Sequence, residues 1–170
     1  LTTLRDRHAR IGSTQVVFEF RGKSGKVHKT GLRDRRLARI VKSCQDVPGQ
    51  RLFQYLDDDG QAHPVESADV NAYLREAMGD DFSAKDFRTW AGTLLAIRGL
   101  LETPCPASEA EAKRQQALCV KATAGLLGNT PAVCRKAYIH PAVFEAHASG
   151  GLALSGGRSD RAFELAVIRF

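Results

Sequence analysis

The alternation of apolar and polar positions near the start of the chain predicts a β-hairpin. Residues 16–20 alternate like a strand with one buried face, residues 22–26 contain the glycines of a turn, and Val27 resumes the extended pattern. Residues 52–56 predict a further short strand, followed by an acidic turn at residues 57–60. These strands form the small β portion of a chain whose remaining pattern is helical.

A basic amphipathic helix is predicted over residues 32–44, directly after the hairpin. Its apolar positions are Leu37, Ile40 and Val41, which lie at helical spacing. Its other positions are rich in cations: Arg33, Arg35, Arg36, Arg39 and Lys42. The chain has a formal net charge of +6 and a pI near 9.4. This excess favours an anionic partner, and nucleic acid is the first candidate.

Capping signals divide the rest of the chain into helices. Three longer helices are predicted: from Ser67 to Met78, from a Ser83–Asp86 capping arrangement to Leu101, and from Ser108 to Leu127. Three shorter helices follow: one begins at Pro131, the next begins at Pro141 after His140, and the last covers residues 158–170. Glycines at positions 150, 151, 156 and 157 predict a flexible linker before the last helix. Trp90 and Tyr55 are expected in the core. The predicted fold class is therefore mainly α with a small β portion (α+β).

Length and composition set the broad class of protein. A chain of 170 residues with 43% hydrophobic and 26% charged residues fits one globular domain with its own core, over residues 1–170. The four widely spaced cysteines predict reduced thiols in a cytoplasmic protein and no metal site built from them. No apolar run approaches the roughly 18 residues of a membrane span, and no signal peptide is visible. We expect no membrane partner.

The segment 128–141 contains the first candidate for chemistry. It places Tyr138 shortly after Arg135 and Lys136, in a helix that begins with Asn129-Thr130-Pro131. A tyrosine beside cations could attack a phosphodiester, because positive charge favours the phenolate and receives the phosphate. The plainer interpretation is a half-buried helical tyrosine with solvated basic neighbours, and this segment alone favours it.

Two earlier segments add cations in an order that suits phosphoryl transfer. Lys23 lies in the turn of the predicted hairpin, where it could reach into a groove. Lys85 and Arg88 are three residues apart and therefore share one face at the start of a helix. Each feature alone is weak, since lysine-rich hairpins and basic helix faces are usually only solvated surface.

Together these segments resemble the catalytic domain of type IB DNA topoisomerases, particularly the compact poxvirus and bacterial enzymes. Residues 20–28, Phe-Arg-Gly-Lys-Ser-Gly-Lys-Val-His, resemble the hairpin of that family. Residues 85–90, Lys-Asp-Phe-Arg-Thr-Trp, are similar to its Lys-x-x-Arg-Thr-aromatic motif. Residues 134–138, Cys-Arg-Lys-Ala-Tyr, resemble its Ser-Lys-x-x-Tyr motif, with cysteine in the place of serine.

The resemblance implies a role for each motif residue. Tyr138 would be the nucleophile, Lys23 the general acid, and Arg88 the group that holds the scissile phosphate. Asn129 stands where many relatives have histidine, and we expect it to donate a hydrogen bond to the phosphate. The residues expected to contact DNA are Lys85, Lys26, Arg135, Lys136 and His28.

The resemblance also predicts the enzyme's partners and requirements. Double-stranded DNA would be cleaved on one strand and resealed without ATP, metal or cofactor, by a monomer that is nucleoid-associated if its source is bacterial. A further catalytic arginine of the family lies upstream of the segment that resembles residues 1–4, so we expect a fragment that lacks this arginine and the N-terminal DNA-clamp domain.

Two alternatives remain open. Tyrosine recombinases share the fold and the nucleophile, but usually have His-x-x-Arg where this chain has Lys85 and Arg88. They also usually have histidine where this chain has Asn129, so both differences favour the topoisomerase. The second alternative is a non-catalytic DNA-binding fragment, since the missing arginine could leave the active site incomplete.

Overall fold

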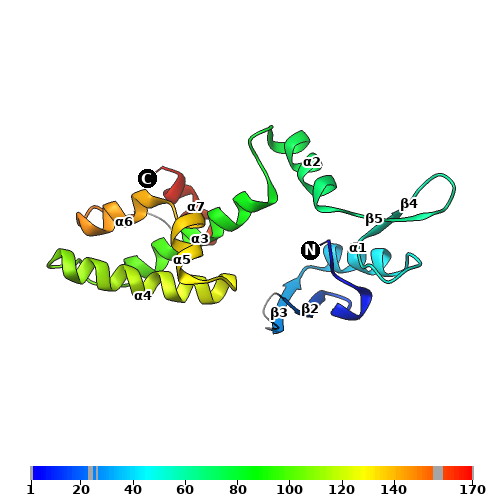
Figure 1. Ribbon diagram of the computed structural model, residues 1–170, viewed down its shortest axis with the longest axis horizontal. Helices are drawn as coiled ribbons and strands as arrows, with labels where there is room; N and C mark the ends of the chain where they lie inside the picture. Colours follow the sequence, from blue (N-terminus) through cyan, green and yellow to red (C-terminus); the bar gives the residue numbers. More distant parts are fainter. Residues whose placement is uncertain (1, 23–24, 26, 155–158, 170) are drawn as a thin grey trace. The chain divides into compact units, whose positions relative to one another are not determined.

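The computed structural model describes residues 2–22, 25, 27–154 and 159–169, which form two compact units. The N-terminal unit comprises Leu1–Asp80 and the C-terminal unit comprises Asp81–Phe170. Figure 1 shows that the sheets belong to the first unit and that the second is entirely helical in its regular elements. The predicted fold class, mainly α with a small β portion, is confirmed.

The N-terminal unit is built on the predicted hairpin. Strands β2 (Gln15–Arg21) and β3 (Val27–Arg33) pair antiparallel, with Arg21 opposite Val27 at the turn end. A three-residue strand, β1 (Ala9–Ile11), adds to the free edge of β2. Val16, Phe18 and Phe20 alternate along β2 and pack against the core of this unit, as the predicted strand pattern requires.

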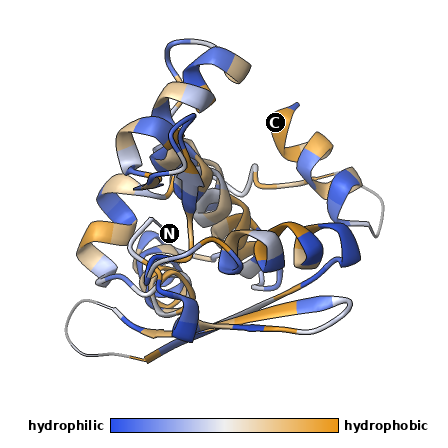
Figure 2. Ribbon diagram, turned by 90° about the vertical axis from the view of Figure 1, so that its right-hand side faces the viewer, coloured by the Kyte–Doolittle hydropathy of each residue, from blue (hydrophilic) through white to orange (hydrophobic). Residues whose placement is uncertain are grey.

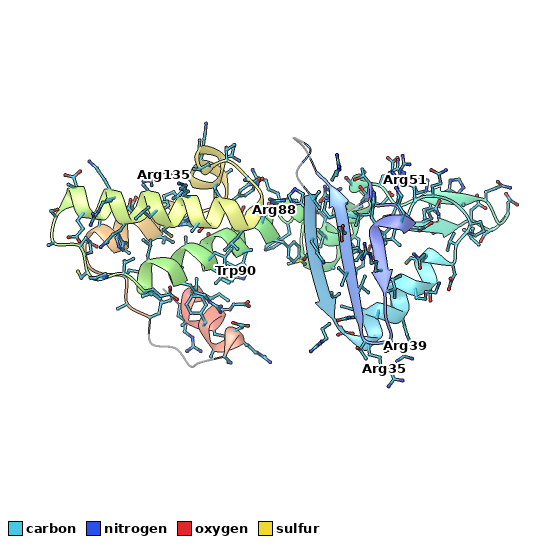
Figure 3. The ribbon with its side chains drawn as sticks, turned by 90° about the horizontal axis from the view of Figure 1, so that it is seen from below. Arg35, Arg39, Arg51, Arg88, Trp90 and Arg135 are labelled. Atoms are coloured by element: carbon cyan, nitrogen blue, oxygen red, sulfur yellow. The ribbon has the colours of Figure 1, made fainter. Side chains whose placement is uncertain are left out.

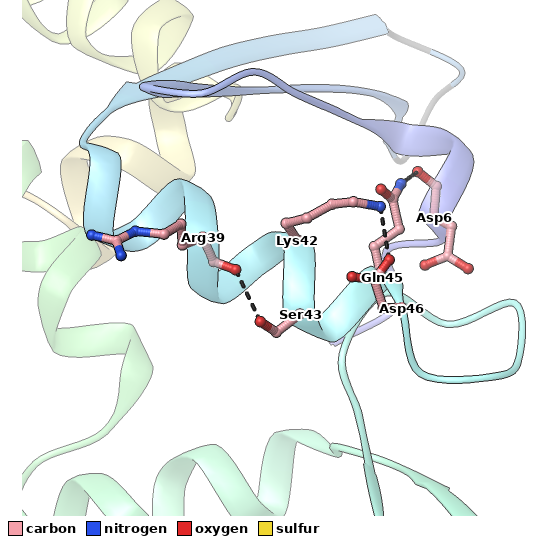
Figure 4. A network of polar contacts seen from close by, with 6 residues as sticks. All are labelled: Asp6, Arg39, Lys42, Ser43, Gln45 and Asp46. Atoms are coloured by element: carbon pink, nitrogen blue, oxygen red, sulfur yellow. Dashed lines mark hydrogen bonds and ion pairs between the residues drawn. The ribbon is translucent and has the colours of Figure 1, made fainter.

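Helix α1 (Arg35–Gln45) begins later than predicted, because residues 32 and 33 still pair with β2. The carboxylate of Asp34 caps it by accepting a hydrogen bond from the Leu37 backbone at 2.8 Å. The helix is polar on most of its surface. At its end, Gln45 donates a hydrogen bond to the carbonyl of Asp6, which precedes β1, at 3.3 Å (Figure 4).

The predicted apolar face of α1 is partly wrong. The buried residues are Ala38 and Val41, whereas Leu37 is 40% and Ile40 is 48% exposed. The face against the sheet is narrow, and the small Ala38 allows the helix to approach it closely. Only Val41 of the three predicted positions therefore reaches the core.

The next elements are one predicted strand, a second strand that was not predicted, and a predicted helix. Strand β4 (Gln54–Leu56) pairs with β5 (Ala62–Pro64) across the acidic turn. Helix α2 spans Ser67–Met78, with Glu66 rather than Ser67 at the cap. Tyr55 was expected in the core, but it is 52% exposed, because its ring lies on the two-stranded ribbon and stacks on His63 of β5, with ring centres 5.5 Å apart.

The C-terminal unit consists of five helices, counted over its described residues: α3 (Ala84–Leu101), α4 (Glu109–Leu127), α5 (Pro131–Ala137), α6 (Pro141–Ala148) and α7 (Asp160–Ile168). The starts of α3 and α4 confirm their predicted caps. Ser83 and Asp86 form the capping arrangement of α3, and Ser108 caps α4. Hydrophobic and hydrophilic residues are mixed along the helices, as expected where one face is buried (Figure 2). Part of the predicted glycine linker, residues 155–158, lies outside the described residues.

The core of the C-terminal unit lies between α3, α4 and α6. Ile97 and Leu100 of α3 are almost fully buried against Val120 of α4 and Val143 of α6. Removing a buried leucine or isoleucine side chain from such a core typically costs about 2–5 kcal/mol. Trp90 was also expected in this core, but it is 36% exposed near the start of α3 (Figure 3), so the described helices cover it only in part.

The cysteines are unpaired, as predicted. Cys119 and Cys134 are buried, and burial raises the pKa of both thiols, which keeps them protonated. Over the described ranges, no three side chains of His, Cys, Asp or Glu are grouped so that they could hold a metal ion. No helix within those same ranges is long and apolar enough to cross a membrane.

His147 of α6 makes the stability of the protein pH-dependent. It is 4% exposed, and its Nε2 lies 3.4 Å from Thr103 Oγ1, while its Nδ1 is buried with no partner among the residues described. Burial lowers its pKa below the ordinary value of 6.5. The unfolded chain therefore takes up the proton more readily, and folding stability that is present above pH 6.5 falls as the pH drops toward the folded-state pKa.

We expect His147→Gln to remove this part of the acid sensitivity. Glutamine can bond Thr103 but does not titrate, so the drop in thermal midpoint between pH 8 and pH 5 should be smaller in the variant than in the parent protein. Thermal unfolding followed by circular dichroism at the two pH values measures this difference. Equal drops in both proteins would contradict the assignment.

Candidate active site

Three of the predicted site residues meet in the C-terminal unit. Arg88 comes from the second turn of α3, Asn129 from the connection between α4 and α5, and Tyr138 from the end of α5. Arg88 Nη2 donates to the Leu127 carbonyl at 2.5 Å and lies 3.4 Å from Asn129 Oδ1. The Arg88 guanidinium carbon is 5.3 Å from the centre of the Tyr138 ring. A cation, an amide and a phenol therefore lie together.

The end of α4 sets the position of Asn129. Gly128 adopts a left-handed conformation with φ 67°, which a residue with a Cβ adopts at a cost. This conformation lets Asn129 N donate to the Ala124 carbonyl at 2.9 Å, while Gly128 N donates to the Gly125 carbonyl. These two hydrogen bonds are the pattern of a Schellman motif. The Leu127 carbonyl at this helix end is left for Arg88.

The amide of Asn129 has a free donor. Arg88 offers only donors, so the oxygen of the Asn129 amide faces it and the nitrogen faces away. That Nδ2 group is buried and has no hydrogen-bond partner within the described part of the chain. Buried donors are normally satisfied, so this unsatisfied Nδ2 group is a candidate donor to an acceptor oxygen of a ligand.

One face of α3 holds the backbone around Tyr138. Thr89 Oγ1 donates to the Ala137 carbonyl at 3.3 Å, and Thr93 Oγ1 accepts from His140 N at 3.1 Å. Gly92 lies between them, and a Cβ there would overlap the Tyr138 carbonyl oxygen. Close approach of α3 to this segment therefore requires glycine.

Sequence analysis missed the part played by Gly92 and Thr93. The available signal was a Thr-x-x-Gly-Thr spacing, which puts three small residues on one helical face. What the spacing could not tell is which distant segment approaches that face.

Tyr138 itself lies at the junction of two helices. It is the C-terminal cap of α5, its N–H donates to the Cys134 carbonyl at 3.0 Å, and it is half-buried. Cys134, in the place of the family's serine, is fully buried below it. Burial raises the pKa of this thiol, and the Arg88 charge opposes that rise to a smaller extent. The cysteine thus packs the helix beneath the tyrosine and offers no reactive thiolate.

The other predicted cations are arranged differently. Lys85 is exposed on the first turn of α3, and Lys136 is exposed near the end of α5. Arg135 turns toward α4 and α6, where it donates to Gln116 Oε1 at 3.3 Å and stacks 4.2 Å over the Phe144 ring (Figure 3). Its guanidinium is engaged in packing the helices and is not placed with that of Arg88.

The residues predicted from the hairpin belong to the N-terminal unit. His28 is half-buried and stacks on Phe20, with ring centres 5.5 Å apart. Lys23 and Lys26 lie outside the described residues. Their parts in catalysis and DNA binding stay predictions.

Comparison with known proteins identifies the family to which the chain belongs. The sequence profile described as "Eukaryotic DNA topoisomerase I, catalytic core" matches residues 1–151, so the chain belongs to the type IB DNA topoisomerase family. One relative is the DNA topoisomerase 1B of Acanthamoeba polyphaga mimivirus, which is 34% identical over 146 residues. The matched region covers 82% of this chain and 44% of the viral protein.

The match confirms the predicted family. It favours that family over the recombinase alternative. The chain spans less than half the length of the viral relative, so what the complete protein does is considered as a proposal below.

Proposed function

We propose that the full-length protein relaxes supercoiled double-stranded DNA by cutting and resealing one strand through Tyr138. The observation that carries the proposal is the meeting of Arg88, Asn129 and Tyr138 within one compact unit. The membership of the type IB family supports it. The viral relative, itself named a DNA topoisomerase 1B, points to the same substrate.

In the cleavage step the Tyr138 oxygen attacks a backbone phosphorus. A bond forms between this oxygen and phosphorus as the bond to the 5′-oxygen breaks, which leaves a 3′-phosphotyrosyl link and a free 5′-hydroxyl. The free end can rotate about the intact strand and so remove supercoils. Attack by the 5′-hydroxyl on the same phosphorus reverses the step, and no ATP is needed because the covalent link conserves the bond energy.

Arg88 and Asn129 would stabilise the charge that develops on the phosphate. A guanidinium has five N–H donors, so Arg88 keeps donors for the nonbridging oxygens beyond its bond to the Leu127 carbonyl. The unsatisfied Nδ2 group of Asn129 supplies a further donor. Donors that are fixed in place before the reaction are an effective source of transition-state stabilisation.

Lys23 would protonate the departing 5′-oxygen, which is otherwise a poor leaving group. We expect Lys23→Ala to slow cleavage of an ordinary duplex strongly. A duplex with a 5′-bridging sulfur has a leaving group that needs no proton, so the variant should recover most of the lost rate on it. Single-turnover cleavage of the two duplexes measures this, and an equally slow variant on the sulfur substrate would remove Lys23 from the general-acid role.

A plasmid assay tests the proposed function as a whole. The full-length protein should relax supercoiled plasmid in EDTA and without ATP, since the charge stabilisation is assigned to side chains. The 170-residue chain tested beside it addresses the second candidate, a fragment that binds DNA without cleaving it. A full-length protein that relaxes DNA only with Mg²⁺ or ATP would contradict the proposal.

A further inference from the structure

A cavity of about 520 Å³ lies in the N-terminal unit, where the 3₁₀ turn η1 (Asp6–His8) runs beside the turn end of the hairpin. Its lining includes Arg5, Arg7, His8, Glu19, Phe20 and Arg21. None of these residues was singled out by sequence analysis as a DNA contact. The cavity is open to solvent and large enough to receive part of a ligand.

The charge of this cavity is strongly positive. Three arginines and one acidic residue, Glu19, line it, and Glu19 already has a counter-cation in Arg10 of the neighbouring strand, at 3.6 Å. For Arg7 and Arg21, the described residues provide no hydrogen-bond or ion-pair partner to the side chain. Two exposed and unengaged guanidinium groups on one cavity suit a ligand with several anionic oxygens.

The other groups of the cavity suit a sugar–phosphate chain. Arg5 is held by its bond to Gln50 Oε1, at 3.4 Å. His8 Nδ1 accepts from the Arg5 N–H at 3.1 Å, so the neutral ring has its proton on Nε2 and can donate. The ring of Phe20, 6.4 Å from that of His8, adds an apolar wall. Cationic donors beside an apolar surface match the alternating phosphate and deoxyribose of a DNA backbone.

We propose that this cavity is a phosphate-binding site for the DNA backbone, in which Arg7 and Arg21 are the principal contacts. The inference rests on the proposed function, because it takes the ligand to be the duplex that the enzyme cleaves. The site holds the duplex and takes no part in bond breaking. Contacts of this kind set the position of a protein on DNA and do not read its sequence.

The test compares two double variants of the full-length protein. Arg7→Gln with Arg21→Gln removes the two contacts, and Arg75→Gln with Arg114→Gln removes the same charge from exposed positions on α2 and α4. Duplex affinity is measured by fluorescence anisotropy over a series of salt concentrations. Each lost phosphate contact lowers the magnitude of the slope of log K against log salt by about 0.9. The slope of the cavity variant should therefore be smaller by about 1.8, and the variant should bind roughly tenfold more weakly at moderate salt.

The salt slope and the duplex affinity of the control variant should fall clearly less than those of the cavity variant. Covalent trapping at saturating DNA should proceed at the parental rate in both. A slope unchanged, or reduced only as much as in the control, would overturn the proposal. So would slower trapping at saturating DNA, because it would place the arginines in the chemical step.

A small free anion is the competing ligand of the same chemistry. If inorganic phosphate raised the thermal midpoint of the parent protein and not of the cavity variant, while the salt slopes stayed equal, the site would bind small anions and the proposal would be wrong. Failure of the proposed function would look different, since the parent protein would then form no covalent adduct whatever the salt slopes are.

Discussion

Replacing Tyr138 by phenylalanine in the full-length protein is expected to abolish covalent capture of DNA and leave duplex binding largely intact. The substitution removes only the attacking oxygen. The phenylalanine ring can still lie 5.3 Å from the Arg88 guanidinium and fill the half-buried position at the end of α5. Denaturing gels of a labelled duplex show the protein–DNA adduct directly, and anisotropy on the same duplex reports binding.

The chain offers two matched controls for this experiment. Tyr55 and Tyr73 are its other tyrosines, and both are exposed in the N-terminal unit. The variants Tyr55→Phe and Tyr73→Phe remove the same atom and should keep full capture. Undiminished capture by Tyr138→Phe, or loss of capture in either control, would show that a different residue attacks the phosphate.

Replacing Arg88 is expected to have the second-largest effect. Loss of one preorganised donor to a developing charge typically costs about 3 kcal/mol, a factor of a hundred or more in rate. We expect Arg88→Lys to be nearly as slow as Arg88→Ala, because lysine keeps the charge but lacks the planar fork that bonds two oxygens at once. Single-turnover cleavage at saturating DNA measures the chemical step apart from binding.

Arg88 also makes a hydrogen bond that supports the fold, so the experiment must separate an effect on stability from an effect on the cleavage step. Because its side chain donates to the Leu127 carbonyl, its loss could loosen the turn that positions Asn129. Thermal unfolding of each variant and a double-mutant cycle with Asn129→Ala distinguish these effects. A coupling near zero with cleavage at the parental rate would exclude Arg88 from the reaction.

The helix boundaries of the C-terminal unit could be predicted because their causes are local. A serine or threonine side chain bonds the first turn, a proline fits the first helical position, and Gly128 ends α4 in a left-handed conformation. Each signal lies within a few residues of the boundary that it sets. The hairpin was predictable for the same reason, since strand alternation and turn glycines are adjacent in sequence.

What the sequence could not provide were contacts between distant segments. Arg135 sits in the nucleophile motif, yet its guanidinium is bound by Gln116 and Phe144 from two other helices. Gly92 looks like an ordinary helical glycine until the Tyr138 backbone is placed against it. Trp90 is a large aromatic residue on a helix and was therefore expected in the core, but its exposure depends on which helices pack over α3.

The site residues also divide into those marked by local motifs and those defined by contacts between distant segments. The motif order identified Arg88, Asn129 and Tyr138 without any structure, and the structure brings their side chains together. The free Nδ2 group of Asn129 depends on the direction that the amide faces, which Arg88 decides through space. Arg7 belongs to no motif, and Arg21 was only a flanking residue of the hairpin motif, so their arrangement in the fold made them candidates.

The most direct test of the account is to identify the amino acid that becomes linked to DNA. The full-length protein is incubated with duplex DNA in EDTA without ATP, trapped, digested with trypsin and nuclease, and examined by mass spectrometry. The account predicts a nucleotide joined through its 3′-phosphate to Tyr138, in the tryptic peptide of residues 137–158. An adduct on Tyr55 or Tyr73, or one joined through a 5′-phosphate, would contradict it.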